Sequence, residues 1–330
     1  IPTQVQKSGN CPNTIRPNKL ALTISAYVNG ASIGISFYPD DADEPKSLLQ
    51  TADTAMYHAK GAGKNNYQFY TAAMNVSALE RLDIENALHQ AVHDTEFELY
   101  YQPILSVPDA TPVSVEALVR WRHPERGTVM PERFIDIAEE SGLIKPLGAW
   151  VLRRACEQLA TWQKNGASIK RMSVNVSARQ FVEGYILQSL REVIADTGVD
   201  PSGLDLELTE SALMQDHEYS MEVLAALKAL GVTVTIDDFG TGYSSLNYLK
   251  RFPIDAIKVD RSFIEGLPDK DDERIVQAIV ALAHSMGLKV VAEGVETQSQ
   301  MMFVQSLGCE EVQGFLFSQA LPPADLPFIH

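Results

Sequence analysis

Two adjacent acids end an apolar run in the second half of the chain. The run at 232–236 leads directly into Asp237 and Asp238, and a loop with glycines at 240 and 242 follows. Most of the other β-rich runs carry a polar group at the C-terminal end, and one of these groups, Glu116, lies within its run. The residues are Glu116, Asn175, Glu207, Glu210, Lys258, Asp260, Glu293, Glu296 and Gln313. Carboxylate and amide oxygens are the ligands that hard divalent cations take in proteins.

So many acids require compensation if they meet in one place. Seven or eight carboxylates would then face only Lys258 and Arg120. Like charges in a pocket of low dielectric constant either raise one another's pKa values or require cations. We therefore predict a site for Mg²⁺ or Mn²⁺, with two ions about 3.5–4 Å apart and Asp237 bridging them.

Each of these residues taken singly has a more ordinary interpretation. A lone Asp at a strand end is typical of a helix cap or a loop, and Glu210 suits the cap of a following helix. Asn175 alone suits a turn, and Lys258 alone suits a surface charge. Only their shared position at strand ends favours a functional site.

The elements that must position these residues form a regular series. Eight β-rich runs alternate with amphipathic helical runs over roughly 240 residues, which is typical of a (β/α)8 barrel. The runs are EFELYYQPI, VSVEALVRW, RMSVNVSA, LDLELTE, VTVTIDD, DAIKVD, KVVAEGV and EVQGFLF. A doubly wound open sheet is the alternative, but no G-x-G-x-x-G follows the first run. In a barrel, the strand C-termini would gather the polar groups on one face.

The 330 residues suit one large domain with an appendage. We interpret residues 1–20 as an unstructured segment or an expression remnant. Residues 21–70 form a small α+β part, with a turn at Asn29–Gly30 and a helix that Gly61 stops. An amphipathic helix over 71–94 follows; its part at 71–85 is the linker, and residues 86–330 form the barrel.

A net charge of −16 argues against a partner that is a nucleic-acid polymer. No apolar run reaches the ~18 residues of a membrane span, so we expect no membrane contact by this segment. Cys11, Cys156 and Cys309 have no metal-ligand spacing, which favours a reducing, cytoplasmic location. A longer parent protein could still carry a membrane anchor.

The motifs resemble those of the EAL-domain family, the cyclic di-GMP phosphodiesterases of bacterial signalling. The family is named after the motif that Glu116, Ala117 and Leu118 form here. The resemblance covers about residues 85–325, with EALVRW, NVSA, ELTES, DDFGTGYSSL, IKVDRSFI, VVAEGVE and QGFLFS in order. It implies a TIM-like barrel whose first strand is antiparallel to the others. It also implies metal-dependent hydrolysis of cyclic di-GMP to linear 5′-pGpG.

The resemblance assigns roles position by position. The implied metal ligands are Glu116, Asn175, Glu207, Asp237, Asp238 and Glu293, and the implied catalytic residues are Glu116, Lys258, Glu293 and Glu296, with Lys258 contacting the nucleophilic water. The implied substrate contacts are Gln102, Leu118, Arg120, Asp260 and Gln313. Glu210 would steady the loop DFGTGYSS, which couples the site to dimerisation, so a homodimer through the barrel is expected.

Residues 31–70 resemble the C-terminal half of a GGDEF (diguanylate cyclase) domain. The GGDEF motif itself and the half before it do not occur in this sequence. We therefore expect no cyclase activity from this segment.

Two other functions were weighed against hydrolysis. A catalytically inactive cyclic di-GMP receptor usually lacks metal ligands or loop residues of the family, and all of them are present here. A metal-dependent carbon–carbon lyase on the same barrel is the third possibility, and DDFGTGYSS argues against it.

Calcium should bind this site but support little hydrolysis, because its looser coordination disfavours the required geometry. The measurement is cyclic di-GMP turnover with Ca²⁺ in place of Mg²⁺. Equal rates with the two ions would refute this expectation.

Overall fold

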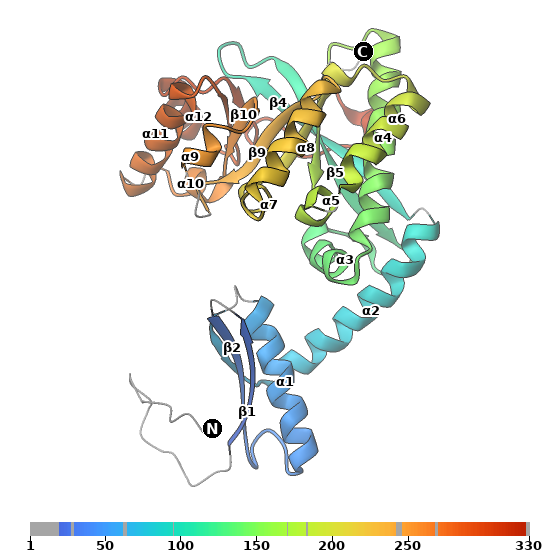
Figure 1. Cartoon of the computed structure of the whole chain (residues 1–330), viewed down its shortest axis with the longest axis vertical. Helices are drawn as coiled ribbons and strands as arrows, with labels where there is room; N and C mark the ends of the chain where they lie inside the picture. The colour runs from blue at the N-terminus through green and yellow to red at the C-terminus, as the bar shows by residue number, and fades with distance from the viewer. Residues whose placement is uncertain are drawn as a thin grey trace. The chain divides into compact units, whose positions relative to one another are not determined.

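The computed structural model describes residues 20–27, 30–61, 65–94, 96–169, 171–182, 184–241, 246–267 and 270–327. They belong to two compact units that divide between Ile84 and Glu85 (Figure 1). The segment predicted to be unstructured, residues 1–20, lies outside the described residues except for its last position.

The first unit is a three-stranded sheet with a helix packed on it. Its elements are β1 (Leu20–Tyr27), β2 (Gly30–Phe37), α1 (Pro45–Gly61), β3 (Tyr67–Phe69) and the start of α2 (Ala72–Asp94). Strands β1 and β2 are antiparallel, and β3 pairs parallel to β2. A Cβ at Gly34 would lie 1.9 Å from the carbonyl oxygen of Ala52, so the close approach of β2 to α1 requires glycine.

These elements confirm the predicted small α+β part and its helix. Of the predicted turn, Gly30 is the first residue of β2, and Asn29 lies outside the described residues.

The second unit is a closed barrel of eight strands, as predicted. Around the barrel the order is β4, β12, β11, β10, β9, β8, β7 and β5, and pairing of β5 with β4 closes the ring. The strands are β4 (Phe97–Ser106), β5 (Pro112–His123), β7 (Arg171–Val176), β8 (Leu204–Thr209), β9 (Thr233–Phe239), β10 (Ala256–Val259), β11 (Lys289–Ala292) and β12 (Glu311–Val312). Strand β4 is antiparallel to both neighbours and the other pairs are parallel, which confirms the predicted antiparallel first strand.

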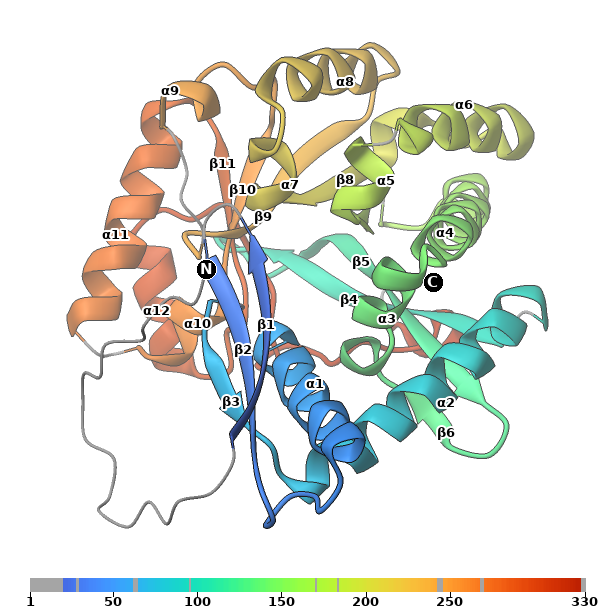
Figure 2. The same ribbon diagram turned by 60° about the horizontal axis from the view of Figure 1, so that its bottom comes forward.

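Helices surround the ring of strands (Figure 2). They are α3 (Ile135–Ser141), α4 (Ile144–Asn165), α5 (Ala178–Val182), α6 (Tyr185–Thr197), α7 (Glu210–Met214), α8 (His217–Ala229), α9 (Leu246–Leu249), α10 (Arg261–Glu265), α11 (Lys270–Ser285) and α12 (Gln298–Ser306). Strand β8 is buried from Leu204 to Leu208, because side chains of a barrel strand face either the interior or the helices.

Several predicted strands are too long at their C-terminal ends. Strand β11 ends at Ala292 and β12 at Val312, so the site residues that follow them lie in loops. Likewise, Glu210 does not end a strand but begins α7.

Glu116 lies inside its strand, as its place within the predicted run VSVEALVRW indicated. This residue lies in the middle of β5, because β5 continues beyond it to pair with the short strand β6 (Gly127–Val129). Glu116 nevertheless faces Gln102 across the β4–β5 register, inside the barrel.

Candidate active site

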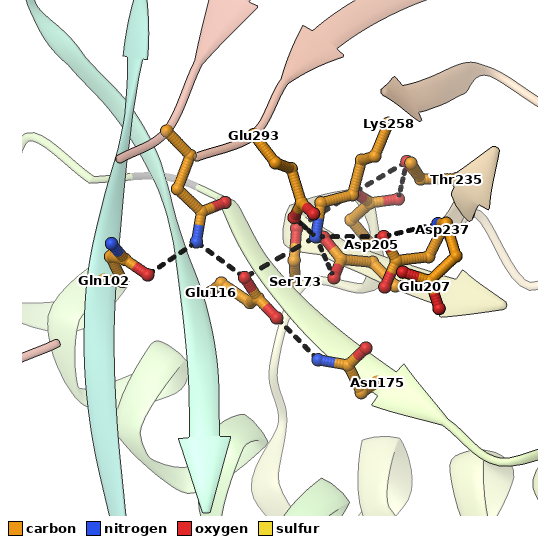
Figure 3. A network of polar contacts seen from close by, with 12 residues as sticks. Gln102, Glu116, Ser173, Asn175, Asp205, Glu207, Thr235, Asp237, Lys258 and Glu293 are labelled. Carbon is orange, nitrogen blue, oxygen red and sulfur yellow. Dashed lines mark hydrogen bonds and ion pairs between the residues drawn. The ribbon is translucent and has the colours of Figure 1, made fainter. Parts of the chain in front are cut away.

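A fully buried lysine lies at the centre of the carboxylates. Lys258 on β10 is 1% exposed. Its Nζ lies 2.5 Å from Glu293 Oε1 and 2.8 Å from Glu207 Oε2. Its distances to Glu116 Oε2 and Asp237 Oδ1 are both 3.5 Å. Figure 3 shows these four acids pointing at the ammonium group from different parts of the barrel. Residues spread over the sequence from 116 to 293 therefore meet at one point, as predicted.

A chain of amides extends from this centre through Glu116. Asn175 Nδ2 donates to Glu116 Oε1 at 2.6 Å, and Gln313 Nε2 donates to Glu116 Oε2 at 2.7 Å. Gln313 Nε2 also donates to Gln102 Oε1 at 2.9 Å, and Gln102 in turn donates to the carbonyl oxygen of Ser318. These bonds fix the orientation of Glu116 from both of its oxygens.

A hollow of about 320 Å³ opens beside this network. Predicted site residues line it: Gln102, Glu116, Leu118, Glu293, Glu296 and Gln313. Arg120 lies two residues beyond Leu118, where its Nη1 donates to the carbonyl oxygen of Val119 and its guanidinium lies over the ring of Tyr100. A larger hollow, of about 640 Å³, lies between β4 and α4, and none of the predicted site residues lines it.

The end of β9 turns sharply between its two acids. Asp238 has φ +53, in the left-handed region that non-glycine residues rarely adopt, and its backbone N–H donates to Asp237 Oδ1. The turn directs Asp237 at Lys258, whereas Asp238 lies near Asp260. The Asp260 side chain also caps α10 by accepting from the backbone N–H of Ser262.

Glu210 contacts the start of the loop that follows β9. Its Oε2 accepts a hydrogen bond from the backbone N–H of Gly240, at 3.3 Å. Gly240 has φ +102, which glycine tolerates best. Residues 242–245 of this loop lie outside the described residues, so the predicted role of Glu210 stays a prediction.

Burial is the largest single influence on the pKa values of the site, but neighbouring charges and amides decide the direction for Lys258 and Glu116. Burial lowers the pKa of Lys258, but the four surrounding carboxylates reverse this and hold the pKa well above its usual range. Burial raises the pKa of Glu207 strongly, and Lys258 offsets only part of that rise. For Glu116, by contrast, Lys258 and the amide donors outweigh burial and lower the pKa. Burial and the charge of Asp237 raise the pKa of Asp238 to about 6. The arrangement is therefore short of positive charge.

The donor chemistry fits a divalent cation. Four carboxylates face one ammonium group, and Glu207 Oε1 is buried with no hydrogen-bond partner in the described part of the chain. Oxygen donors with an excess of negative charge are what Mg²⁺ and Mn²⁺ bind. Among the described residues, however, no three His, Cys, Asp or Glu side chains are already arranged around a point where an ion could be held. The acids converge on Lys258 instead.

Five residues of the hollow were not predicted from the sequence. They are Glu132, Arg261, Gly294, Gly314 and Phe315. Arg261 follows Asp260 directly, and Phe315 lies two residues after Gln313. This closeness in sequence to predicted site residues is the feature that could have identified them. Arg261 also lies over the ring of Phe315, with its guanidinium carbon 5.9 Å from the ring centre.

Comparison with known proteins agrees with this geometry. The model of the EAL domain family matches residues 85–320. The chain belongs to the EAL domain family. A shorter match to the family "Diguanylate cyclase, GGDEF domain" covers residues 13–66, which confirms the predicted resemblance of the segment before the EAL domain.

Two curated relatives of this EAL domain protein come from Pseudomonas aeruginosa. The bifunctional diguanylate cyclase/cyclic di-GMP phosphodiesterase MucR is 46% identical over 297 residues, and the cyclic di-GMP phosphodiesterase NbdA is 45% identical over 308 residues. The matches cover 90% and 93% of this chain but 43% and 39% of the relatives. The chain thus spans about two-fifths of their length.

Solved structures of EAL proteins share the fold. A PaMucR phosphodiesterase in complex with c-di-GMP is 44% identical, with a TM-score of 0.71 over 73% of this chain and 98% of that one. The EAL enzyme Bd1971, in a form bound to cAMP and cyclic di-GMP, is 33% identical with a TM-score of 0.71, covering 88% of this chain and 78% of that one.

Within the described part of the chain, no helix combines the length and the apolar character that crossing a bilayer requires.

Replacing Lys258 by Met should destabilise the metal-free barrel by about 3–5 kcal/mol, because it leaves buried carboxylates without their cation. The matched control is Lys228→Met, whose ion pair with Asp255 is about one-third exposed; this variant should lose about 1 kcal/mol or less. Urea denaturation in the presence of a chelator measures both. Equal losses would contradict the central role of Lys258.

The pKa of Glu293 predicts a pH dependence of stability. Burial, and then the charges of Asp237 and Glu116, raise this pKa to about 8, although Lys258 lowers it. Because the folded carboxyl group binds its proton more tightly than the unfolded one, its contribution is complete below the ordinary carboxyl pKa and is lost as the pH rises through about 8.

We therefore expect the metal-free native protein to lose stability relative to Glu293→Gln between about pH 5 and pH 8, by up to about 1.4 kcal/mol per pH unit. Urea denaturation across this pH range measures the difference. A stability difference that stays constant over this pH range would show that Glu293 is already ionised in the folded protein.

Proposed function

We propose that this EAL domain hydrolyses cyclic di-GMP to linear 5′-pGpG and depends on Mg²⁺ or Mn²⁺. The observation that carries the proposal is the convergence of four carboxylates on the buried Lys258, beside a hollow lined by Gln102 and Gln313. The PaMucR complex supports cyclic di-GMP as the ligand. The relatives named as cyclic di-GMP phosphodiesterases support hydrolysis as the reaction.

The residues that would hold the ions either contact Lys258 or are neighbours of a residue that does. They are Glu116, Asn175, Glu207, Asp237, Asp238 and Glu293. When bound, Mg²⁺ or Mn²⁺ would supply a nucleophilic water near neutral pH and neutralise charge on the phosphate. The unpartnered Glu207 Oε1 and the excess of acids support this assignment.

The protein's own side chains would bind and orient the substrate. The amides of Gln102 and Gln313 face the hollow, and Leu118 gives it an apolar surface. Arg120 lies at the edge of the network, from which it can donate to a phosphate or a guanine. Lys258 holds its acids in register and supplies a fixed positive charge next to the phosphate, where negative charge develops.

The proposed reaction breaks one phosphodiester bond. A water oxygen forms a bond to phosphorus in line with the bond to the 3′-oxygen, which breaks. The water loses a proton and the 3′-oxygen gains one. Glu293 and Glu296 line the hollow and are the carboxyl groups placed to exchange these protons. The cleavage leaves a 5′-phosphate on the opened dinucleotide.

A homodimer through the barrel and a cytoplasmic location remain predictions. The loop after β9 that would couple dimerisation to the site includes residues 242–245, which lie outside the described residues.

Glu116→Ala should lower turnover of cyclic di-GMP at least about 100-fold, because it removes the residue that joins the amide chain to the ion site. The assay incubates the protein with cyclic di-GMP and Mg²⁺ or Mn²⁺, with and without chelator, and separates the products by chromatography. The native protein should yield 5′-pGpG only when the metal is free.

The control variant is Glu98→Gln. Glu98 lies on β4, and its partner is Arg122 in a half-exposed ion pair outside the candidate site, so this variant should keep native turnover. Full activity of a folded Glu116→Ala variant would reject the assignment of this residue. Binding of cyclic di-GMP without hydrolysis by the native protein would indicate a receptor instead of an enzyme.

A further inference from the structure

A second layer of polar side chains lies directly beneath the candidate site. It consists of Ser173 on β7, Asp205 on β8 and Thr235 on β9, which are 1%, 6% and 2% exposed. Interiors of such barrels are usually filled by bulky branched apolar side chains. Burying a carboxylate and two hydroxyl groups costs folding free energy unless these groups are hydrogen-bonded.

Asp205 is the common acceptor of this layer. Its Oδ2 accepts from Ser173 Oγ at 3.0 Å. Both of its oxygens lie 2.9 Å from Thr235 Oγ1. One carboxylate on the middle strand thus ties together the side chains of three adjacent strands, as Figure 3 also shows.

Each layer residue lies two positions before a residue of the candidate site on the same strand. Ser173 precedes Asn175, Asp205 precedes Glu207, and Thr235 precedes Asp237. Side chains two positions apart on a strand point to the same face, so the three bonded side chains lie one step below the three proposed ligands.

The strand register brings the two layers into correspondence. Ser173 pairs with Asp205, and Asn175 pairs with Glu207 two residues further along β7 and β8. On the other side, Glu207 pairs with Thr235. A shift of one strand against another would therefore break the Asp205 bonds and displace the ligands together.

Side-chain packing from below does not fix these residues. A hollow of about 320 Å³ lies under the layer, and Ser173, Asp205, Glu207 and Thr235 all line it. Where close packing is missing, side chains lose the contacts that would hold one conformation. The hydrogen bonds to Asp205 therefore add to the backbone pairing of β7, β8 and β9 in fixing the side chains at this depth of the barrel.

We propose that Asp205, held by Ser173 and Thr235, is a positioning residue that sets the spacing of Asn175, Glu207 and Asp237 for a divalent cation. This inference rests on the proposed function. Asp205 itself touches neither substrate nor ion; it acts through the strands that carry the ligands. Groups that orient ligands in this way typically contribute 10–100-fold to metal affinity.

The test measures Mn²⁺ binding to the full chain without nucleotide, by the electron paramagnetic resonance signal of free Mn²⁺. Thr235→Val keeps the shape of the side chain and removes the hydroxyl, and Ser173→Ala removes the other donor. The double variant should bind Mn²⁺ about 10–100-fold more weakly, and each single variant should lie between it and the native protein. Thr235→Ser, which restores the hydroxyl, should return affinity to near the native value.

The matched control is Thr233→Val on the same strand. The Thr233 hydroxyl donates to the carbonyl oxygen of Leu204 at 3.0 Å, so this variant loses a hydrogen bond but not one to Asp205. It should bind Mn²⁺ as the native protein does. Melting temperatures of all variants show that they are folded. If the double variant does not fold, the comparison of Thr235→Val with Thr235→Ser decides.

The outcomes separate this inference from the proposed function. Affinity within twofold of native in a folded double variant, or an equal loss in Thr233→Val, overturns the positioning role while hydrolysis by the native protein stands. A native protein that binds Mn²⁺ but does not hydrolyse cyclic di-GMP refutes the proposed function, and the binding comparison still decides the role of Asp205. A native protein that binds no Mn²⁺ overturns both.

Discussion

The burial of one ammonium group among four carboxylates is the constraint on which the candidate site depends. Lys258 is almost inaccessible to solvent, and burying an unpaired charge of this kind would cost several kcal/mol. The barrel satisfies it with acids from β5, β8 and β9 and from the loop after β11. Each acid is in turn tolerated in the interior because the lysine is there. The pairing is therefore mutual, and the excess of acids remains available for cations.

The closed topology explains how such distant residues share one lysine. Closure depends on β4, which runs antiparallel between β5 and β12. That strand also places Gln102 across from Glu116 and within reach of Gln313, so the strand that closes the ring contributes to the amide chain. Beneath this level, Asp205 links β7, β8 and β9. The barrel interior thus contains two polar layers, one around Lys258 and one around Asp205.

The acids, amides and lysine of the candidate site all lie within residues 85–320, the part of the chain that matches the EAL domain family. The chain spans about two-fifths of the length of the two curated relatives, and a GGDEF-like segment precedes its EAL domain. The first unit retains a helix packed closely on β2 at Gly34, whereas the polar network described here lies wholly within the barrel unit.

The sequence by itself determined the alternation of strands and helices, and it identified the acids, because periodicity and residue type are local properties of the chain. All eight predicted strands are present, and motif spacing identified Glu116, Lys258 and Glu293. Only the tertiary structure decided that Glu293 follows a strand and that the acids meet at Lys258. It alone revealed the layer around Asp205, since Ser173 and Thr235 carry no chemical signal in the sequence. Those features depend on strand register and barrel closure, which arise from contacts between residues far apart in the chain.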